Sequence, residues 1–208
     1  MLLAHMIKLY GNPGSTCTRK VLMTLEESKT TYELSNLDFM KGEHKADAHV
    51  ARQPFGQMPA LDDDGFAMYE SRAMMRYIAE KAGSPLEPKD VKARATMEQW
   101  ISIETSNFTP HAMKFVYHHF MGRKQDEQTM EAAAAGLDKA CDVLEARLAT
   151  SPYLAGADMT LADVAYMPYI EYAMNTPAKA VFGKHPALMA WWKRLSERPT
   201  WRKVIGKA

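Results

Sequence analysis

Ser15 is the residue whose type and position best suit it to chemistry. It follows a turn-forming run at residues 11–14 and precedes an apolar stripe that recurs at helical spacing over residues 17–25. A hydroxyl at the start of a helix lies beside unpaired backbone N–H groups and the positive end of the helix dipole, so it helps to stabilise an anion. We expect that anion to be a thiolate. The alternative is that Ser15 only caps its helix.

The size of the expected effect supports a role for this hydroxyl. A hydrogen bond to a charged acceptor contributes about 1.5–3 kcal/mol, and the helix terminus adds roughly 0.3–1 kcal/mol. At about 1.36 kcal/mol per pKa unit, the pKa of a thiol falls by about 1–3 units. A free thiol with a pKa of about 8.5 would then ionise near or below neutral pH. Ser15 is therefore the expected catalytic residue.

The residues around Ser15 predict a small mixed sheet that positions the turn. Residues 6–10 and Thr30–Leu37 favour strands on either side of a helix that ends near Ser28-Lys29. This order of strand, helix and strand indicates a parallel pair. The Asp64-Gly65 pair between two short apolar runs predicts an antiparallel hairpin. Between these elements, Phe39–Gln53 is expected to form a short helix with loops.

Two further features lie at the ends of the hairpin. Pro59 stands at the entrance of the first strand of the hairpin. A proline is compatible with this position if the strand lies at an edge of the sheet or if the Met58–Pro59 peptide bond is cis. Ser71 follows its second strand and is a plausible cap for a helix. The apolar side of that helix is predicted from its spacing as Met74, Met75, Ile78 and Ala82.

Strand signals end after a linker rich in Gly and Pro at residues 83–90. The apolar spacing over Val91–Met121 predicts a long helix that is broken at most by Pro110. A second helix is predicted over Glu127–Leu148, where apolar residues recur at alternating four- and three-residue steps and place Cys141 in the core. A capping box with Thr160 and Asp163 starts another helix, and a last one is expected over Pro186–Glu197. The predicted domains are an α/β domain over residues 1–82 and an all-α domain over residues 91–208.

Composition excludes several classes of protein. The chain has 208 residues, 47% of them hydrophobic, and a formal net charge of +1, so neither nucleic acid nor a membrane surface is an expected partner. Its two cysteines are far apart, which favours a reducing compartment, and no metal-ligand spacing occurs. Residues 1–5 are too short for a signal peptide, and no apolar run reaches about 18 residues. We expect a cytoplasmic protein without a bound metal.

Five motifs together resemble the cytosolic glutathione transferases, and most closely their phi class. Each motif is weak alone, but their order and spacing are specific, and the resemblance runs from Met6 nearly to the end of the chain. The motifs are Tyr10-Gly11-Asn12-Pro13-Gly14-Ser15, Gly42-Glu43-His44-Lys45, Gln53-Pro54-Phe55-Gly56-Gln57-Met58-Pro59-Ala60-Leu61, Glu70-Ser71-Arg72-Ala73 and Leu161-Ala162-Asp163.

The resemblance implies a thioredoxin-like N-terminal domain that binds glutathione, a helical C-terminal domain that supplies a pocket for a hydrophobic electrophile, and a homodimer. Ser15 would donate a hydrogen bond to the glutathione sulfur. The other glutathione-binding residues implied are His44 and Lys45 for the glycyl carboxylate, Gln57 and the Met58 backbone for the cysteinyl portion, and Glu70 and Ser71 for the γ-glutamyl end. Pro59, which follows Met58, also belongs to the implied glutathione site. Glutathione would be a co-substrate, with no cofactor. Conjugation is the expected reaction, with peroxide reduction as a possible second activity.

The electrophile pocket is the part that the sequence defines least. The candidates are chosen by their place in the predicted elements, and a core role is the alternative for the aromatic ones. They are Phe39 and Met40 in the loop after the second strand, His111, Phe115, His118 and His119 in the long helix, and Tyr166 with Tyr169 in a later helix.

Two other functions compete with conjugation. Cys17 could be the centre of a thiol–disulfide or deglutathionylating oxidoreductase, since a thiol near a helix N-terminus can have a lowered pKa. However, Cys17 shares an apolar stripe with Val21 and Leu25, so we expect it to face the core. The second alternative is a non-catalytic binding protein that retains the fold.

Overall fold

The computed structural model describes residues 6–207, which form two compact units. The first unit runs to Glu87 and includes the chain again from Pro199 onward, and the second is Pro88–Arg198. The division falls inside the linker predicted at residues 83–90. The last residues of the chain, which the sequence placed with the helical domain, belong by their contacts to the first unit.

A mixed sheet of four strands is the centre of the first unit. The strands are β1 (Ile7–Gly11), β2 (Tyr32–Asn36), β3 (Ala60–Asp63) and β4 (Phe66–Tyr69), in the order β2-β1-β3-β4. β1 pairs in parallel with β2 and antiparallel with β3, and β3 and β4 form the hairpin. The predicted parallel pair and hairpin are confirmed.

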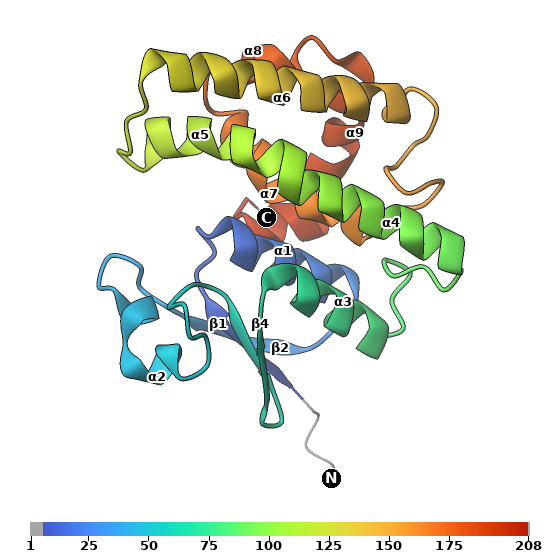
Figure 1. Ribbon diagram of the computed structural model, residues 1–208. Coiled ribbons are helices and arrows are strands. Elements are labelled where there is room, and N and C mark those ends of the chain that lie inside the picture. The colour runs from blue at the N-terminus through green and yellow to red at the C-terminus, as the bar shows by residue number, and fades with distance from the viewer. Residues whose placement is uncertain (1–5, 208) are drawn as a thin grey trace. The chain divides into compact units, whose positions relative to one another are not determined.

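The helices of this unit cover the sheet. α1 (Thr16–Glu27) and α3 (Ser71–Lys81) pack side by side, and the short α2 (Asp47–Val50) lies apart from them (Figure 1). A 3-10 turn, η1 (Glu43–Lys45), precedes α2. α3 buries Met74, Met75 and Ile78 as predicted, but Ala82 is exposed and Ala79 is buried instead. Ala82 lies beyond the last helical residue, Lys81, so the helical spacing no longer places it on the buried face.

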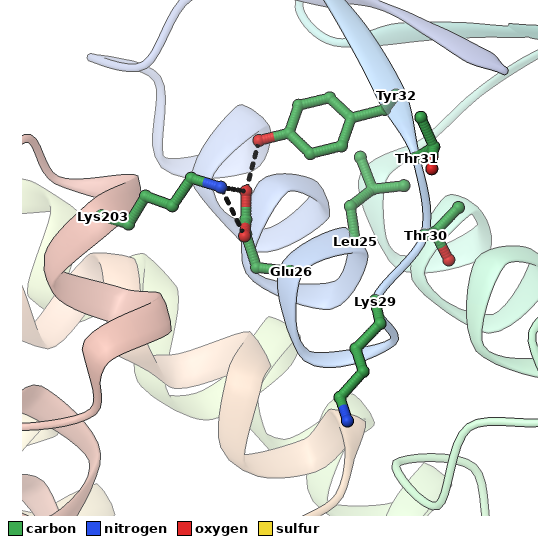
Figure 2. A pocket seen from close by; sticks show the side chains of 7 residues that line it. All are labelled: Leu25, Glu26, Lys29, Thr30, Thr31, Tyr32 and Lys203. Atoms are coloured by element: carbon green, nitrogen blue, oxygen red, sulfur yellow. Dashed lines mark hydrogen bonds and ion pairs between the residues drawn. The ribbon is translucent and has the colours of Figure 1, made fainter.

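α10 (Pro199–Val204) joins the first unit by packing on α1. Lys203 forms an ion pair with Glu26 at 2.8 Å, and the Tyr32 hydroxyl donates to the same carboxylate at 2.7 Å. Figure 2 shows these side chains around a pocket of about 460 Å³, which is also lined by Leu25, Lys29, Thr30 and Thr31. Burial and the Glu26 carboxylate raise the pKa of Tyr32. None of the predicted site residues lines this pocket.

The second unit is helical, as predicted. Its long first helix is continuous, but a π-helical segment separates its two halves, and Pro110 lies in the first turn of the second half, where a missing N–H costs little. The elements are α4 (Val91–Ile103), η2 (Glu104–Phe108), α5 (Thr109–Phe120), α6 (Glu127–Leu148), α7 (Leu161–Ala173), α8 (Lys179–Phe182) and α9 (Pro186–Ser196).

The capping box at the start of α7 is present, with Thr160 at the N-cap. Asp163 is fully buried and accepts hydrogen bonds from Thr160 N at 2.9 Å, Leu154 N at 3.1 Å and Trp191 Nε1 at 2.9 Å. One carboxylate therefore holds the start of α7, the preceding loop and α9 together.

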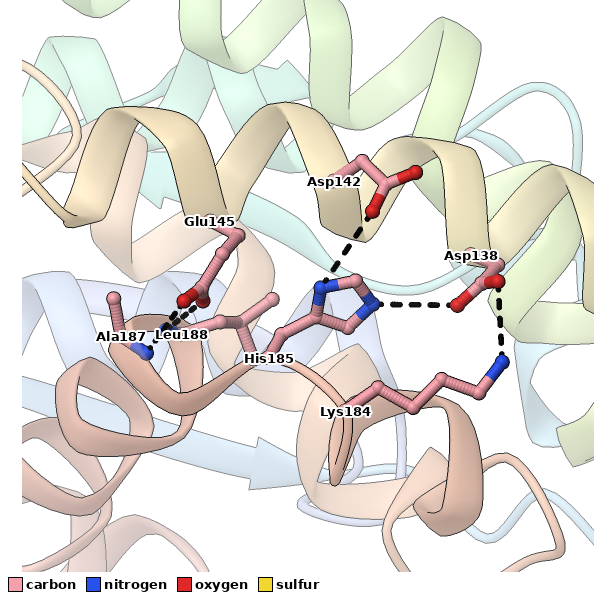
Figure 3. A network of polar contacts seen from close by, with 7 residues as sticks. All are labelled: Asp138, Asp142, Glu145, Lys184, His185, Ala187 and Leu188. Carbon is pink, nitrogen blue, oxygen red and sulfur yellow. Dashed lines mark hydrogen bonds and ion pairs between the residues drawn. The ribbon is translucent and has the colours of Figure 1, made fainter.

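A second polar network attaches the start of α9 to α6 (Figure 3). The buried His185 imidazole lies 3.3 Å from Asp138 and 3.8 Å from Asp142, and Lys184 pairs with Asp138 at 3.1 Å. Glu145 accepts hydrogen bonds from the first backbone N–H groups of α9, at Ala187 and Leu188. The N-terminus of α9 is thus capped by Glu145 of α6. A carboxylate is stabilised there by the positive end of the helix dipole.

Among residues 6–207, no helix has the length and apolar character needed to span a membrane. Within the same part of the chain, no cluster of three or more His, Cys, Asp or Glu side chains has an arrangement suited to a metal ion.

Candidate active site

Ser15 occupies the N-cap of α1, as the sequence predicted. Its Oγ accepts a hydrogen bond from Thr18 N at 3.3 Å, and its own N–H donates to Asn12 O at 2.8 Å. A hydroxyl has one donor and two acceptor positions. Because Ser15 Oγ is the acceptor in its bond to Thr18, its O–H remains able to donate to a bound anion.

The turn before Ser15 is held tightly against α1. A Cβ on Gly11 would lie 2.7 Å from Thr18 Oγ1 and 3.3 Å from Pro59 Cβ, so only glycine fits at this position. Arg19 donates from Nε to the Pro13 carbonyl at 2.6 Å. The position of the Ser15 hydroxyl is therefore set by contacts on both sides of the turn.

Cys17 is only partly buried, whereas its spacing predicted a core position. Its side chain is half-buried, whereas Thr18 and Lys20 are fully buried. The buried part of α1 begins at Thr18, because that residue fills the space left by the missing Cβ of Gly11. In the first turn of α1 the buried face is thus displaced by one residue from the apolar stripe.

The loop after β2 carries His44 and Lys45 in the turn η1. Phe39 stacks on the His44 imidazole, and Nδ1 of His44 is buried without a hydrogen-bond partner among the described residues. Burial, followed by the charges of Lys45 and His49, lowers the pKa of His44 below its usual value. Lys45 donates to the Phe55 carbonyl at 3.1 Å.

The segment that enters β3 is fixed by two buried side chains whose role the sequence did not reveal. His49 Nε2 lies 2.6 Å from Gln57 O, and Gln53 Oε1 accepts from Gln57 N at 3.0 Å. The Gln57 backbone is therefore held at both ends, while its side chain is exposed. The Met58–Pro59 peptide bond that follows is cis. The only sequence signal for Gln53 was its position in the proline-containing motif.

The start of α3 differs from the prediction at one residue. Glu70, not Ser71, is at the N-cap, and its side chain makes no capping hydrogen bond. Ser71 is buried at the first helical position. Glu70 has φ of 73° and ψ of 101°, which is strained for a residue with a side chain, and such strain concentrates at functional sites.

Strand register brings these four segments to one edge of the sheet. Tyr10 lies opposite Ala60, Ala60 lies opposite Tyr69, and Gly11 lies opposite Asn36. The turn with Ser15, the loop with His44, the cis bond before β3 and Glu70 after β4 consequently share that edge. This edge therefore offers a hydroxyl donor, basic side chains and an acid, which are the groups that could bind an extended ligand with charges of both signs.

The electrophile candidates are spread over both units. Phe39 and Met40 are exposed in the first unit. In the second unit, Tyr166 is fully buried and donates to the Trp100 carbonyl at 3.1 Å, which favours the core alternative for this residue. Tyr169 is buried as well.

The candidates on α5 are not equivalent. The His111 ring fills the space beside Gly136 of α6, and His118 Nδ1 accepts from Gln125 N at 3.1 Å, so both have structural partners. Phe115 is buried, whereas His119 is exposed. His119 is the α5 candidate with the greatest access to solvent.

Comparisons with known proteins agree with this architecture. Residues 5–80 match the model for the glutathione S-transferase N-terminal domain, and residues 108–199 match that for the C-terminal domain. Glutathione S-transferase F9 of Arabidopsis thaliana is 37% identical over 97% of both chains. The crystal structure of glutathione transferase F7 from Populus trichocarpa is 37% identical with a TM-score of 0.92, covering 97% of this chain and 99% of that one.

A third relative has been solved with a glutathione conjugate bound. Glutathione S-transferase I from maize, solved in complex with an atrazine glutathione conjugate, is 32% identical over 97% of both chains, with a TM-score of 0.88. Together these matches show that the chain belongs to the glutathione S-transferase family, with phi-class enzymes among its relatives. It is accordingly a glutathione transferase, built on the thioredoxin-like fold of that family.

Proposed function

We propose that Ser15 donates a hydrogen bond to the sulfur of bound glutathione and keeps it ionised for attack on a hydrophobic electrophile. The observation that supports this most directly is the N-cap geometry of Ser15, whose Oγ accepts from Thr18 N and leaves the O–H to donate. The helix terminus adds its positive end to the same place. The thiol proton is lost to solvent before the attack.

In the proposed reaction, the sulfur of glutathione forms a bond to the electrophilic carbon. In a displacement, this carbon loses its leaving group together with the electron pair of the broken bond. In an addition, the electron pair of its multiple bond moves to the neighbouring atom, which then takes a proton from water. No bond forms between the enzyme and either substrate. Reduction of an organic hydroperoxide by two glutathione molecules, giving an alcohol, water and glutathione disulfide, is the proposed second activity of the same thiolate.

The rest of the tripeptide would lie along the sheet edge. His44 and Lys45 would bind the glycyl carboxylate, and Glu70 with Ser71 would bind the γ-glutamyl end. Gln57 and the Met58 backbone before Pro59 would pair with the cysteinyl portion. The unpartnered Nδ1 of His44, the exposed side chain of Gln57 and the strained backbone of Glu70 support these roles.

We further propose that the helical unit supplies the electrophile pocket, with Phe115 and His119 of α5 as candidate residues, because Phe115 is apolar and His119 is exposed. The maize relative, which holds an atrazine conjugate, supports an aromatic halide as test substrate. Glutathione is the only small molecule that the proposed chemistry needs besides the electrophile, so no cofactor is invoked. We also propose a cytoplasmic location, with neither nucleic acid nor a membrane as a partner, and the formal net charge of +1 supports this.

A homodimer is the proposed assembly. Phe55 is 66% exposed and its ring lies beside that of Tyr69, which is 37% exposed, so the two form a contiguous apolar surface of the kind that marks interfaces. Sedimentation of the parent and of Phe55→Ser tests this proposal. A parent that sediments as a monomer at micromolar concentration would contradict it.

The rate of conjugation against pH tests the role of Ser15. Ser15→Ala should raise the apparent pKa of the bound thiol by about 1–2 units and lower the rate at neutral pH, because the donor to the thiolate is lost. Cys17→Ser is the matched control and should leave the pH profile unchanged. If instead Ser15→Ala retained full rate while Cys17→Ser abolished it, the oxidoreductase alternative centred on Cys17 would replace the proposal.

A further inference from the structure

Asn12 makes four hydrogen bonds around the turn that precedes Ser15. Its Oδ1 accepts from Gly14 N at 2.8 Å, its carbonyl accepts from Ser15 N at 2.8 Å, and its N–H donates to Thr18 Oγ1 at 3.4 Å. These three bonds close the turn on itself and against α1. Asparagine is suited to this position because its short amide can hydrogen-bond to the backbone two residues further on.

The fourth bond leaves the turn. Asn12 Nδ2 donates to the Leu37 carbonyl at 2.9 Å, and Leu37 N donates to the Gly11 carbonyl at 3.0 Å. Residues 11 and 12 therefore hold the end of β2 from both sides. Leu37 is separated from Asn12 by 25 positions in sequence, so this is a tertiary contact between two loops of the sheet edge.

The loop that starts at Leu37 leads directly to His44. Asp38 N donates to Glu43 Oε2 at 2.7 Å, and Asp38 Oδ1 accepts from Met40 N at 2.9 Å. Glu43 N donates back to the Asp38 carbonyl at 3.2 Å. Because this loop is closed by its own hydrogen bonds, it transmits the position of Leu37 to His44.

We infer that Asn12 is a positioning residue that couples two parts of the glutathione site, the donor to the sulfur and the contacts for the glycyl carboxylate. Through Oδ1 it fixes the turn that presents the Ser15 hydroxyl, and through Nδ2 it fixes the loop that presents His44. The inference rests on the proposed function of Ser15 and His44. It adds that one side chain aligns the donor for the sulfur with the contacts for the glycyl carboxylate.

Two substitutions distinguish the hydrogen bond that Asn12 Oδ1 accepts from Gly14 N from the one that Asn12 Nδ2 donates to the Leu37 carbonyl. Asn12→Ala removes both and should lower kcat about three- to tenfold, raise the apparent pKa of the bound thiol by about 0.5–1 unit, and raise KM for glutathione. Asn12→Ser retains a short acceptor for Gly14 N but is too short to reach Leu37. It should raise KM for glutathione about threefold while the pH profile of kcat stays close to that of the parent.

Asn175→Ala is the matched control. Asn175 donates one hydrogen bond from Nδ2 to the Glu171 carbonyl at the end of α7, outside the proposed glutathione site. The kinetic constants of the Asn175→Ala enzyme should therefore equal those of the parent. Thermal unfolding of every variant measures the structural effect of each substitution. If Asn12→Ala fails to fold, the KM of Asn12→Ser decides, and an unchanged KM overturns the inference.

The outcomes distinguish this inference from the function on which it rests. If Ser15→Ala shifts the pKa of the bound thiol but Asn12→Ala does not, Asn12 has no positioning role and the role of Ser15 stands. If Ser15→Ala leaves that pKa unchanged, the proposed function fails whatever Asn12 does. An equal loss of Tm without any change in KM or in the pH profile would reduce Asn12 to a structural residue and overturn the inference.

Discussion

The phenyl ring of Phe39 lies parallel to the imidazole of His44, with ring centroids 4.6 Å apart and an interplanar angle of 7°. Phe39 was predicted to line the electrophile pocket, yet its ring contacts a residue proposed to bind glutathione. Stacked aromatic pairs contribute about 0.5–1.5 kcal/mol beyond the burial of their surfaces. The imidazole is consequently held in one orientation before a ligand arrives.

We predict that Phe39→Ala raises KM for glutathione about two- to tenfold and leaves KM for the electrophile unchanged, because the His44 ring loses its support. Steady-state kinetics with each substrate varied in turn measure both constants. Phe39→Trp should retain the parent KM for glutathione. Met40→Ala, at a neighbouring position that is 91% exposed, is the control. A change confined to KM for the electrophile would contradict this prediction and would support the original assignment of Phe39 to the electrophile pocket.

His44 should titrate below 6.5, its ordinary pKa, since burial and the positive charges of Lys45 and His49 disfavour the imidazolium. The folded state then prefers neutral His44, so this residue's contribution to stability is present above the unfolded pKa and is lost as pH falls toward the folded pKa. Bound glutathione should raise the pKa, because a carboxylate favours the cation.

Histidine proton resonances recorded against pH, with and without glutathione, measure both effects. Lys45→Ala should raise the pKa of His44 in the free protein, and His44→Gln identifies its resonance. A pKa that glutathione leaves unchanged would argue against a contact between His44 and the glycyl carboxylate.

The two cysteines should differ strongly in reactivity. Burial raises the pKa of the Cys141 thiol to about 12, whereas the Cys17 side chain is half-buried. Because a thiolate is the reactive form, a disulfide reagent should label one thiol per native chain at pH 8 and two in denaturant. Cys17→Ser should abolish the native labelling, and Cys141→Ala should leave it intact. Fast labelling of native Cys17→Ser would contradict the burial of Cys141.

Asp163→Ala should lower the free energy of unfolding by more than about 3 kcal/mol, because it leaves three buried N–H groups of Thr160, Leu154 and Trp191 without their acceptor. Denaturant titration measures this loss. Asp163→Asn should lose less, since its amide oxygen still accepts. Asp158→Ala is the control, because that side chain is exposed. An effect of Asp163→Ala no larger than that of Asp158→Ala would refute the structural role of the carboxylate.

Local chemistry made much of the fold and site predictable. The turn before Ser15, the Asp64-Gly65 hairpin and the capping box of Thr160 and Asp163 all depend on residues within a few positions of one another. Their structures follow from dihedral preferences and short-range hydrogen bonds. The predictions of the hairpin, of the capping box and of Ser15 as an N-cap were therefore correct. Helical periodicity likewise placed Cys141 in the core.

Contacts between distant residues were decided by the tertiary structure alone. Thr18, not Cys17, fills the space at Gly11, and Tyr166 is a core residue whose hydroxyl donates to the Trp100 carbonyl. The bond from Asn12 to Leu37 and the stacking of Phe39 on His44 depend on which loops the strand register brings to one edge. Sequence spacing defines the face of an element, but only packing selects the partner that meets it.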